Sequence, residues 1–76
     1  MTVRLSECCR GDRLKIVEID AGRGAVLNLM DLGLAVGRYV ELRRRSLFRG
    51  PILVAHGEGE VAIGHRLAEK ILVEKE

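Results

Sequence analysis

The sequence predicts a mostly β protein, a small barrel of about five strands with one short helix near residues 25–32 and a helical turn near residues 66–70. The chain has 76 residues, enough for one hydrophobic core. Short runs of alternating apolar and polar residues are separated by tight turns that contain glycine. A short open sheet would expose its edges, which favours closure into a barrel. We therefore expect residues 1–76 to form a single domain.

The composition predicts a core built from Val, Leu and Ile. Hydrophobic residues make up 47% of the chain and charged residues 32%, a balance typical of folded proteins. Tyr39 and Phe48 are the only aromatic residues. So few rings offer little surface for stacking bases, which argues against single-strand nucleic-acid binding.

The N-terminal part of the chain predicts a turn followed by a strand. Residues 6–11 indicate a single helical turn that Ser6 caps and a glycine closes. Residues 13–20 then alternate, with Leu14 and Ile16 on one face and charged residues on the other. We expect this strand to bury its Leu14 face.

The helix expected at residues 25–32 shows the clearest helical periodicity in the chain. Val26, Leu29, Met30 and Gly33 follow the spacing i, i+3, i+4, i+7, which predicts that these positions face the core. Gly33 is also the natural end of the helix, because glycine adopts the left-handed conformation that closes one.

The middle of the chain predicts a hairpin. Residues 39–43 alternate as a strand, but continuing the alternation would bury Arg44 without a partner, so the strand should end or bend there. Residues 46–51 form the tip, and a returning strand follows at residues 52–55. Proline at the start of a returning strand is well tolerated.

The C-terminal part predicts two more strands. A turn with two glycines at residues 56–59 precedes a strand at residues 61–63. A helical turn at residues 66–70 then leads to a last strand at residues 71–73, which closes the sheet.

Charge and cysteine content indicate a cytoplasmic protein. The net charge of +2 is too small to mark a nucleic-acid-binding protein by itself. Cys8 and Cys9 are adjacent, and bridging neighbours strains disulfide geometry, so both are expected as free thiols in a reducing compartment. No apolar run is long enough for a signal peptide or a membrane span.

Catalytic motifs are not recognisable, so we expect no enzyme activity and no cofactor. Gly22 and Gly24 lack the third glycine of a dinucleotide loop, and no Gly-Lys-Ser/Thr sequence could cradle phosphates. Ser6 and Ser46 are the only serines, and neither lies in a nucleophile motif.

Four residues are weak candidates for metal ligands: Cys8, Cys9, His56 and His65. Adjacent cysteines lack the spacing that lets two thiolates converge on one ion. The two histidines are nine residues apart and do not form an i, i+4 pair on a helix. Weak transition-metal binding at a surface histidine remains an alternative.

The segment at residues 38–49 is the most distinctive local feature, with five arginines, one acidic residue and an apolar Leu-Phe pair at the expected hairpin tip. Exposed aromatic residues beside arginines are typical of docking surfaces. A solvated charged face and a phosphate-binding surface are the alternatives. The candidate partner-binding residues, here and after the helix, are Leu34, Val36, Arg44, Arg45, Leu47, Phe48 and Arg49.

The ordered set of motifs resembles the FeoA family, small cytoplasmic proteins of bacterial and archaeal ferrous iron uptake with an SH3-like barrel. The motifs that carry the resemblance are Leu5-Ser6, Gly11-Asp12, Ile16–Ile19, Leu29–Leu34, Val40–Leu42, Gly50–Ile52, Val61–Gly64 and Leu67–Val73. The resemblance implies an accessory protein that docks on the cytoplasmic side of a FeoB-type transporter and is recruited to the membrane by that partner.

The same barrel is similar to the C-terminal domain of iron-dependent repressors. This likeness implies a metal-responsive or metal-binding domain as an alternative function. A nucleic-acid-binding SH3-like module that uses the arginines is a second alternative, although the low net charge gives no reason to expect nucleic acid as a partner.

Overall fold

The computed structural model describes residues 1–76 and contains six strands in one antiparallel sheet. The strands are β1 (Thr2–Arg4), β2 (Arg13–Ile19), β3 (Tyr39–Arg45), β4 (Ile52–His56), β5 (Gly59–Ile63) and β6 (Ile71–Lys75). The helical elements are the 3-10 turn η1 (Leu5–Glu7) and the helices α1 (Arg23–Asp31) and α2 (His65–Ala68).

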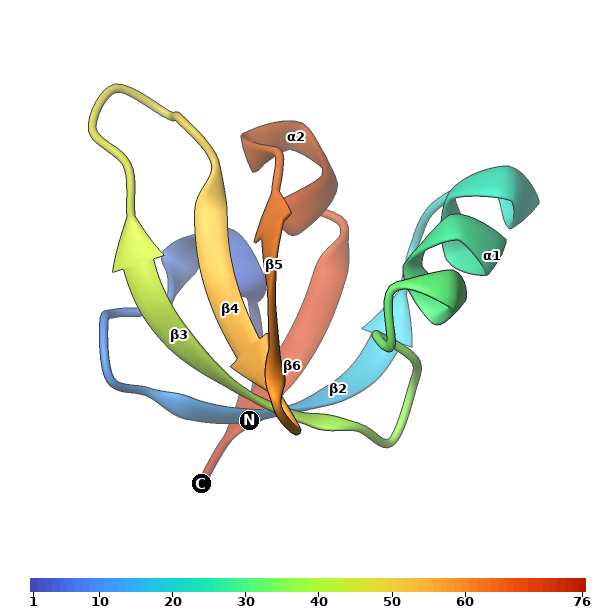
Figure 1. Cartoon of the computed structure of the whole chain (residues 1–76), viewed down its shortest axis with the longest axis horizontal. Coiled ribbons are helices and arrows are strands. Elements are labelled where there is room, and N and C mark those ends of the chain that lie inside the picture. Colours follow the sequence, from blue (N-terminus) through green and yellow to red (C-terminus); the bar gives the residue numbers. More distant parts are fainter.

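The sheet has the strand order β1-β6-β2-β3-β4-β5 and curls into a barrel-like shape (Figure 1). The mostly β fold is confirmed, with one strand more than expected: β1 is only three residues long and gives no alternation signal. Hydrogen bonding does not close the barrel, because β1 and β5 remain edge strands. Instead η1, which follows β1, packs against α2, which follows β5.

The core is aliphatic, as the composition predicts. It consists of Leu5, Cys8, Leu14, Ile16, Leu29, Leu34, Val40, Leu42, Ile52, Val54, Ile63, Ala68, Ile71 and Val73. Leu14 and Ile16 of β2 point inward as expected. Both aromatic rings stay outside.

The first turn begins earlier than the sequence suggested. η1 starts at Leu5, and the Arg4 N–H donates to Glu7 Oε1 at 3.0 Å, so a glutamate stabilises the start of the turn. Ser6 lies inside the turn and is buried, so the prediction that Ser6 caps it is wrong. Burial of Leu5 in the core fixes this earlier start.

Helix α1 is confirmed, but it buries a narrower face than its periodicity predicts. Leu29 is buried and Val26 is partly buried, whereas Met30 is 52% exposed. The inward position predicted for Met30 is therefore wrong. Figure 1 shows that α1 stands to one side of the sheet and does not lie across it.

The end of α1 is a Schellman motif, as the glycine after the helix suggested. Gly33 has φ +88°, its N–H donates to the Met30 carbonyl at 2.9 Å, and the Leu34 N–H donates to the Leu29 carbonyl at 2.8 Å. This reversal returns Leu34 to the core, where Leu29 also lies. Gly33 thus attaches the helix to the barrel.

Strand β3 bends where burial of an arginine would otherwise be required. Its pairing with β4 shifts register between Leu42 and Arg44, so Arg43 is the extra residue of a β-bulge. The bulge breaks the inward alternation, and Arg43, Arg44 and Arg45 are all exposed. The predicted bend is confirmed, although the strand continues beyond it to Arg45.

Replacing Gly33 by alanine should destabilise the fold. The left-handed conformation costs a non-glycine residue about 1–2 kcal/mol, and the new Cβ would also meet the imidazole of His56. Chemical denaturation should show a loss of that size in the free energy of unfolding. Gly24→Ala is the control: Gly24 lies inside α1 with open space around it, so alanine there should stabilise the protein or leave it unchanged. Equal losses for both variants would contradict this role of Gly33.

Candidate functional site

After Met1, the most exposed apolar residues of the chain lie at the tip of the β3–β4 hairpin, which we define as residues 44–51. Leu47 is 81% exposed and Phe48 is 97% exposed. The tip projects beyond the sheet as a loop (Figure 1), at the same end as α2. The loop expected at residues 46–51 is confirmed, since β3 ends at Arg45 and β4 begins at Ile52; the tip as defined here also includes the last two residues of β3.

The turn of the tip places two bulky residues in the left-handed region. Phe48 has φ 56° and Arg49 has φ 61°, and the Gly50 N–H donates to the Leu47 carbonyl at 3.2 Å. Positive φ at both central positions is the pattern of a type I′ turn, for which Asn-Gly is the favoured sequence. Phe48 and Arg49 therefore place backbone strain in this turn, which Asn-Gly at the same positions would relieve.

The arginines of the tip have no carboxylate partners. Arg45 Nη1 donates to the Cys8 carbonyl at 2.8 Å, which fixes the root of the tip against the segment after η1. The three ion pairs of the structure lie elsewhere and involve Arg43 twice and Lys75 once. Arg44 and Arg49 are exposed and free to meet an external anion.

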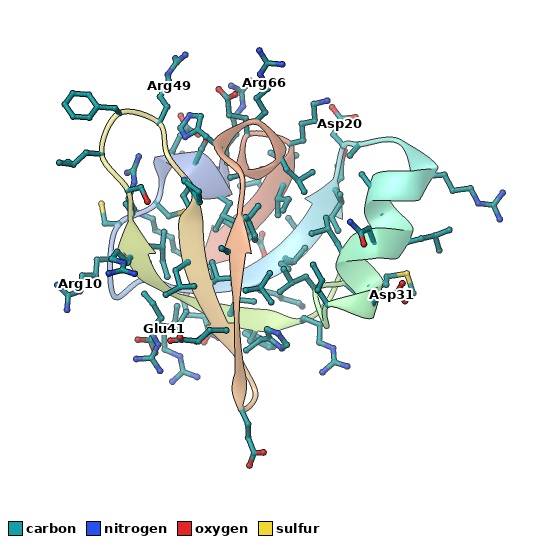
Figure 2. The ribbon with its side chains drawn as sticks, turned by 45° about the horizontal axis from the view of Figure 1, so that its top comes forward. Arg10, Asp20, Asp31, Glu41, Arg49 and Arg66 are labelled. Atoms are coloured by element: carbon teal, nitrogen blue, oxygen red, sulfur yellow. The ribbon has the colours of Figure 1, made fainter.

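A shallow hollow lies between the tip and α2. His65 of α2 lines this hollow together with Arg45, Phe48 and Arg49. Figure 2 shows that Arg49 and Arg66 project from this end of the molecule, whereas Glu41 lies away from it. The basic character of the tip therefore extends onto α2.

A second exposed apolar surface lies on α1 and the segment after it. We call it the helix surface; its residues are Leu27, Met30, Leu32 and Val36. Val36 is 61% exposed, which is compatible with its predicted role in partner binding. Sequence reasoning missed Leu27, Met30 and Leu32, because helical spacing shows which residues share a face but not how wide the buried stripe is.

Leu34 cannot contribute to either surface. It is fully buried as part of the Schellman motif, so its predicted role in partner binding is wrong. Arg44, Arg45, Leu47, Phe48 and Arg49 all lie on the hairpin tip, and Val36 is separate from them on the helix surface. The candidates therefore form two surfaces.

The four candidate metal ligands do not converge. No three His, Cys, Asp or Glu side chains are placed so that they could hold an ion together. His56 ends β4 beside Gly33, whereas His65 begins α2 next to the hairpin tip. Weak metal binding at a single exposed group stays a prediction.

The two cysteines have contrasting environments. Cys8 is buried in the core, and its thiol donates to the Arg4 carbonyl at 3.5 Å. Burial, reinforced by the negative charge of Asp12, raises the pKa of the Cys8 thiol, so it stays protonated at neutral pH. Cys9 is exposed. Cys8 is thus a small apolar residue of the core, whereas Cys9 is accessible to reagents.

Asp12 closes the turn that contains Cys9. The Cys9 N–H donates to Asp12 Oδ2 at 2.8 Å, and Lys75 Nζ lies 3.4 Å from the same oxygen. The backbone hydrogen bond, helped by Lys75, lowers the pKa of Asp12. This carboxylate therefore links the turn to the C-terminal strand β6.

Fold and surfaces together define a class of protein: an SH3-like barrel with a basic hairpin tip and an exposed apolar helix surface. Residues 3–75 match the FeoA domain. The chain belongs to the FeoA family.

Known proteins of the same fold agree with this assignment. A relative from Methanocaldococcus jannaschii, named as an Fe(2+) transport protein A, is 34% identical over 64 residues, which cover 84% of this chain and 76% of the relative. A crystal structure of the iron uptake regulatory protein FeoA superposes with a TM-score of 0.87 at 34% identity and covers 100% of this chain and 99% of that one.

A manganese-dependent transcriptional repressor contains a similar domain. It superposes with a TM-score of 0.89 at 25% identity over 99% of this chain and 42% of the repressor. The expected likeness to a repressor domain is thus confirmed at the level of fold. Neither α1 nor α2 is long and apolar enough to cross a bilayer.

The accessibility of the two thiols predicts their reactivity. A thiol reagent added to the native protein should modify Cys9 and leave Cys8 unmodified, because Cys8 is buried and its pKa is raised. Mass spectrometry should show one modification under native conditions and two after denaturation. Rapid double modification of the native protein would contradict the buried position of Cys8.

The lowered pKa of Asp12 predicts how acid affects stability. A carboxyl group whose pKa is lower in the folded state stabilises the fold above its unfolded pKa, which is ordinarily 3.8. This contribution is lost as the pH falls through the folded-state pKa. Asp12→Asn should therefore lower the melting temperature at neutral pH, and its difference from the wild type should shrink in acid. A difference that stays constant down to strongly acidic pH would contradict this role of Asp12.

Proposed function

We propose that residues 1–76 act as one FeoA-type SH3-like domain, a cytoplasmic accessory protein of ferrous iron uptake. It docks on the cytoplasmic side of a FeoB-type transporter, is held at the membrane by that contact, and modulates the transporter without catalysing a reaction itself. Membership of the FeoA family is the observation that carries this proposal. The exposed apolar side chains on an otherwise well-packed barrel support it.

The helix surface is the better candidate for the contact with the transporter. Leu27 and Met30 lie three residues apart and so are neighbours on the exposed side of α1. Leu32 and Val36 extend the apolar character beyond the helix end. Protein interfaces have apolar centres, and these four exposed side chains would supply one.

The helix surface can be tested by a binding assay with the transporter's cytoplasmic region. The double variant Met30→Ser/Val36→Ser should weaken binding by about 30-fold, because removing a central apolar contact costs at least ~2 kcal/mol. Both side chains are exposed, so the fold should be unaffected. Isothermal titration with purified proteins gives the dissociation constants.

Tyr39→Ser is the matched control for this experiment. Tyr39 is about as exposed as Met30 but lies on β3, with its ring beside Lys15. It should bind the transporter as the wild type does. Wild-type affinity of the helix-surface variant would remove that surface from the interface, and absence of binding by the wild-type protein would contradict the proposed function itself.

A further inference from the structure

We propose that the hairpin tip binds the surface of an anionic phospholipid bilayer, with Leu47 and Phe48 entering the interface and the surrounding arginines contacting headgroup phosphates. This contact is separate from the proposed docking on a transporter and does not depend on it. Three observations support it: the exposure of the two apolar residues, the separation of charge along the hairpin, and the strained turn.

The exposed pair has the geometry of an anchor. Leu47 and Phe48 lie at the extreme end of a projecting hairpin, and no other part of the chain covers them. Arginines stand on both sides of the pair in the sequence, at positions 45 and 49. The core of a protein interface is depleted of charged residues, whereas a bilayer offers anionic phosphates directly above an apolar layer. The alternation of charge and apolar surface at the tip fits the bilayer better.

The charge of the hairpin is separated along its length. Residues 42–57 contain no aspartate or glutamate. Glu41 and Glu60 both stand opposite Ala55 at the base of the β3–β4–β5 sheet, where Arg43 pairs with them. The tip therefore presents Arg44, Arg45 and Arg49 without any acidic neighbour on the hairpin.

Helix α2 extends this basic end. Arg66 is exposed and projects from the same end as Arg49 (Figure 2). Asp20 also lies at this end, displaced toward α1. A basic residue near an anionic membrane surface strengthens binding by roughly fivefold, so a few arginines together give reversible attachment.

The strained turn makes it possible to test membrane binding separately from stability. Phe48 and Arg49 hold left-handed conformations that Asn-Gly would adopt without strain. The variant Phe48→Asn/Arg49→Gly should therefore melt no lower than the wild type while losing both an apolar and a basic contact. If Phe48 and Arg49 served only to stabilise the fold, this variant would melt at a lower temperature than the wild type.

Vesicle co-sedimentation tests the proposal with purified full-length chain. The wild type should bind vesicles of equal parts phosphatidylglycerol and phosphatidylcholine, should not bind phosphatidylcholine alone, and should be released by salt. Leu47→Ser/Phe48→Ser and Arg44→Gln/Arg49→Gln should each weaken binding by about tenfold or more. Phe48→Asn/Arg49→Gly should weaken binding by a similar factor.

Matched control variants remove two arginines or two apolar side chains that lie outside the hairpin tip. Arg13→Gln/Arg38→Gln removes two exposed arginines at or beside the start of β2 and β3, and Leu27→Ser/Met30→Ser removes two exposed apolar side chains on α1. Both should bind vesicles nearly as the wild type does. Because the chain has no tryptophan, Phe48→Trp gives a single tryptophan whose emission should shift to the blue on vesicles. Tyr39→Trp should not shift.

Several results would overturn the proposal. Binding that is absent, that is equal on neutral vesicles, or that survives in the Leu47→Ser/Phe48→Ser variant would exclude insertion of the tip. If the tip variants bind vesicles normally but lose the transporter's cytoplasmic region, the tip is a protein contact, as the sequence first suggested. If the wild type does not bind vesicles but slows the electrophoretic migration of duplex DNA, and the Arg44→Gln/Arg49→Gln variant does not, the tip is a nucleic-acid contact.

Discussion

The charge of Arg44 cannot be buried without a partner, and the shape of the β3–β4 hairpin follows from that constraint. Alternation along β3 would turn this side chain into an aliphatic core. The bulge at Arg43 bends the strand and keeps the Arg44 side chain out of the core. The strand then continues to Arg45 as a run of exposed arginines. Arg45 then fixes the hairpin to the Cys8 carbonyl. The projecting tip, with its apolar end and free arginines, depends on this one irregularity.

A second constraint holds the other surface in place. Helix α1 buries little more than Leu29, so its attachment depends on the Schellman motif at Gly33, which returns Leu34 to the core. With so few buried side chains, α1 keeps Leu27 and Met30 in solvent. A helix anchored at one end and apolar on its outer side is suited to contact another molecule. The hairpin tip thus depends on the β-bulge in β3, and the helix surface depends on the Schellman motif at the end of α1.

Much of the fold could be predicted from the sequence, because strand alternation and glycine turns are local signals. The strands from β2 onward, the helix near residues 25–32, the hairpin tip and the bend at Arg44 were all indicated by such signals. β1 was missed because three residues carry no period, and its pairing with β6 is a long-range contact. Met30 was misplaced because helical spacing does not reveal how wide a stripe of the helix is buried. Leu34 was misplaced because the Schellman motif that returns it to the core forms only in the folded chain. The grouping of candidate residues into two surfaces is a property of the folded chain alone.

In this account, the protein works at the membrane, with the helix surface against a transporter and the hairpin tip against the bilayer. Two weak contacts made together bind far more tightly than either alone. The most direct test is the affinity of the chain for the intact transporter reconstituted in anionic bilayers compared with neutral ones. Binding should be tighter in the anionic bilayer, and this advantage should disappear in the Leu47→Ser/Phe48→Ser variant. Equal affinity in both bilayers, or no binding in either, would contradict a role for the hairpin tip at the membrane.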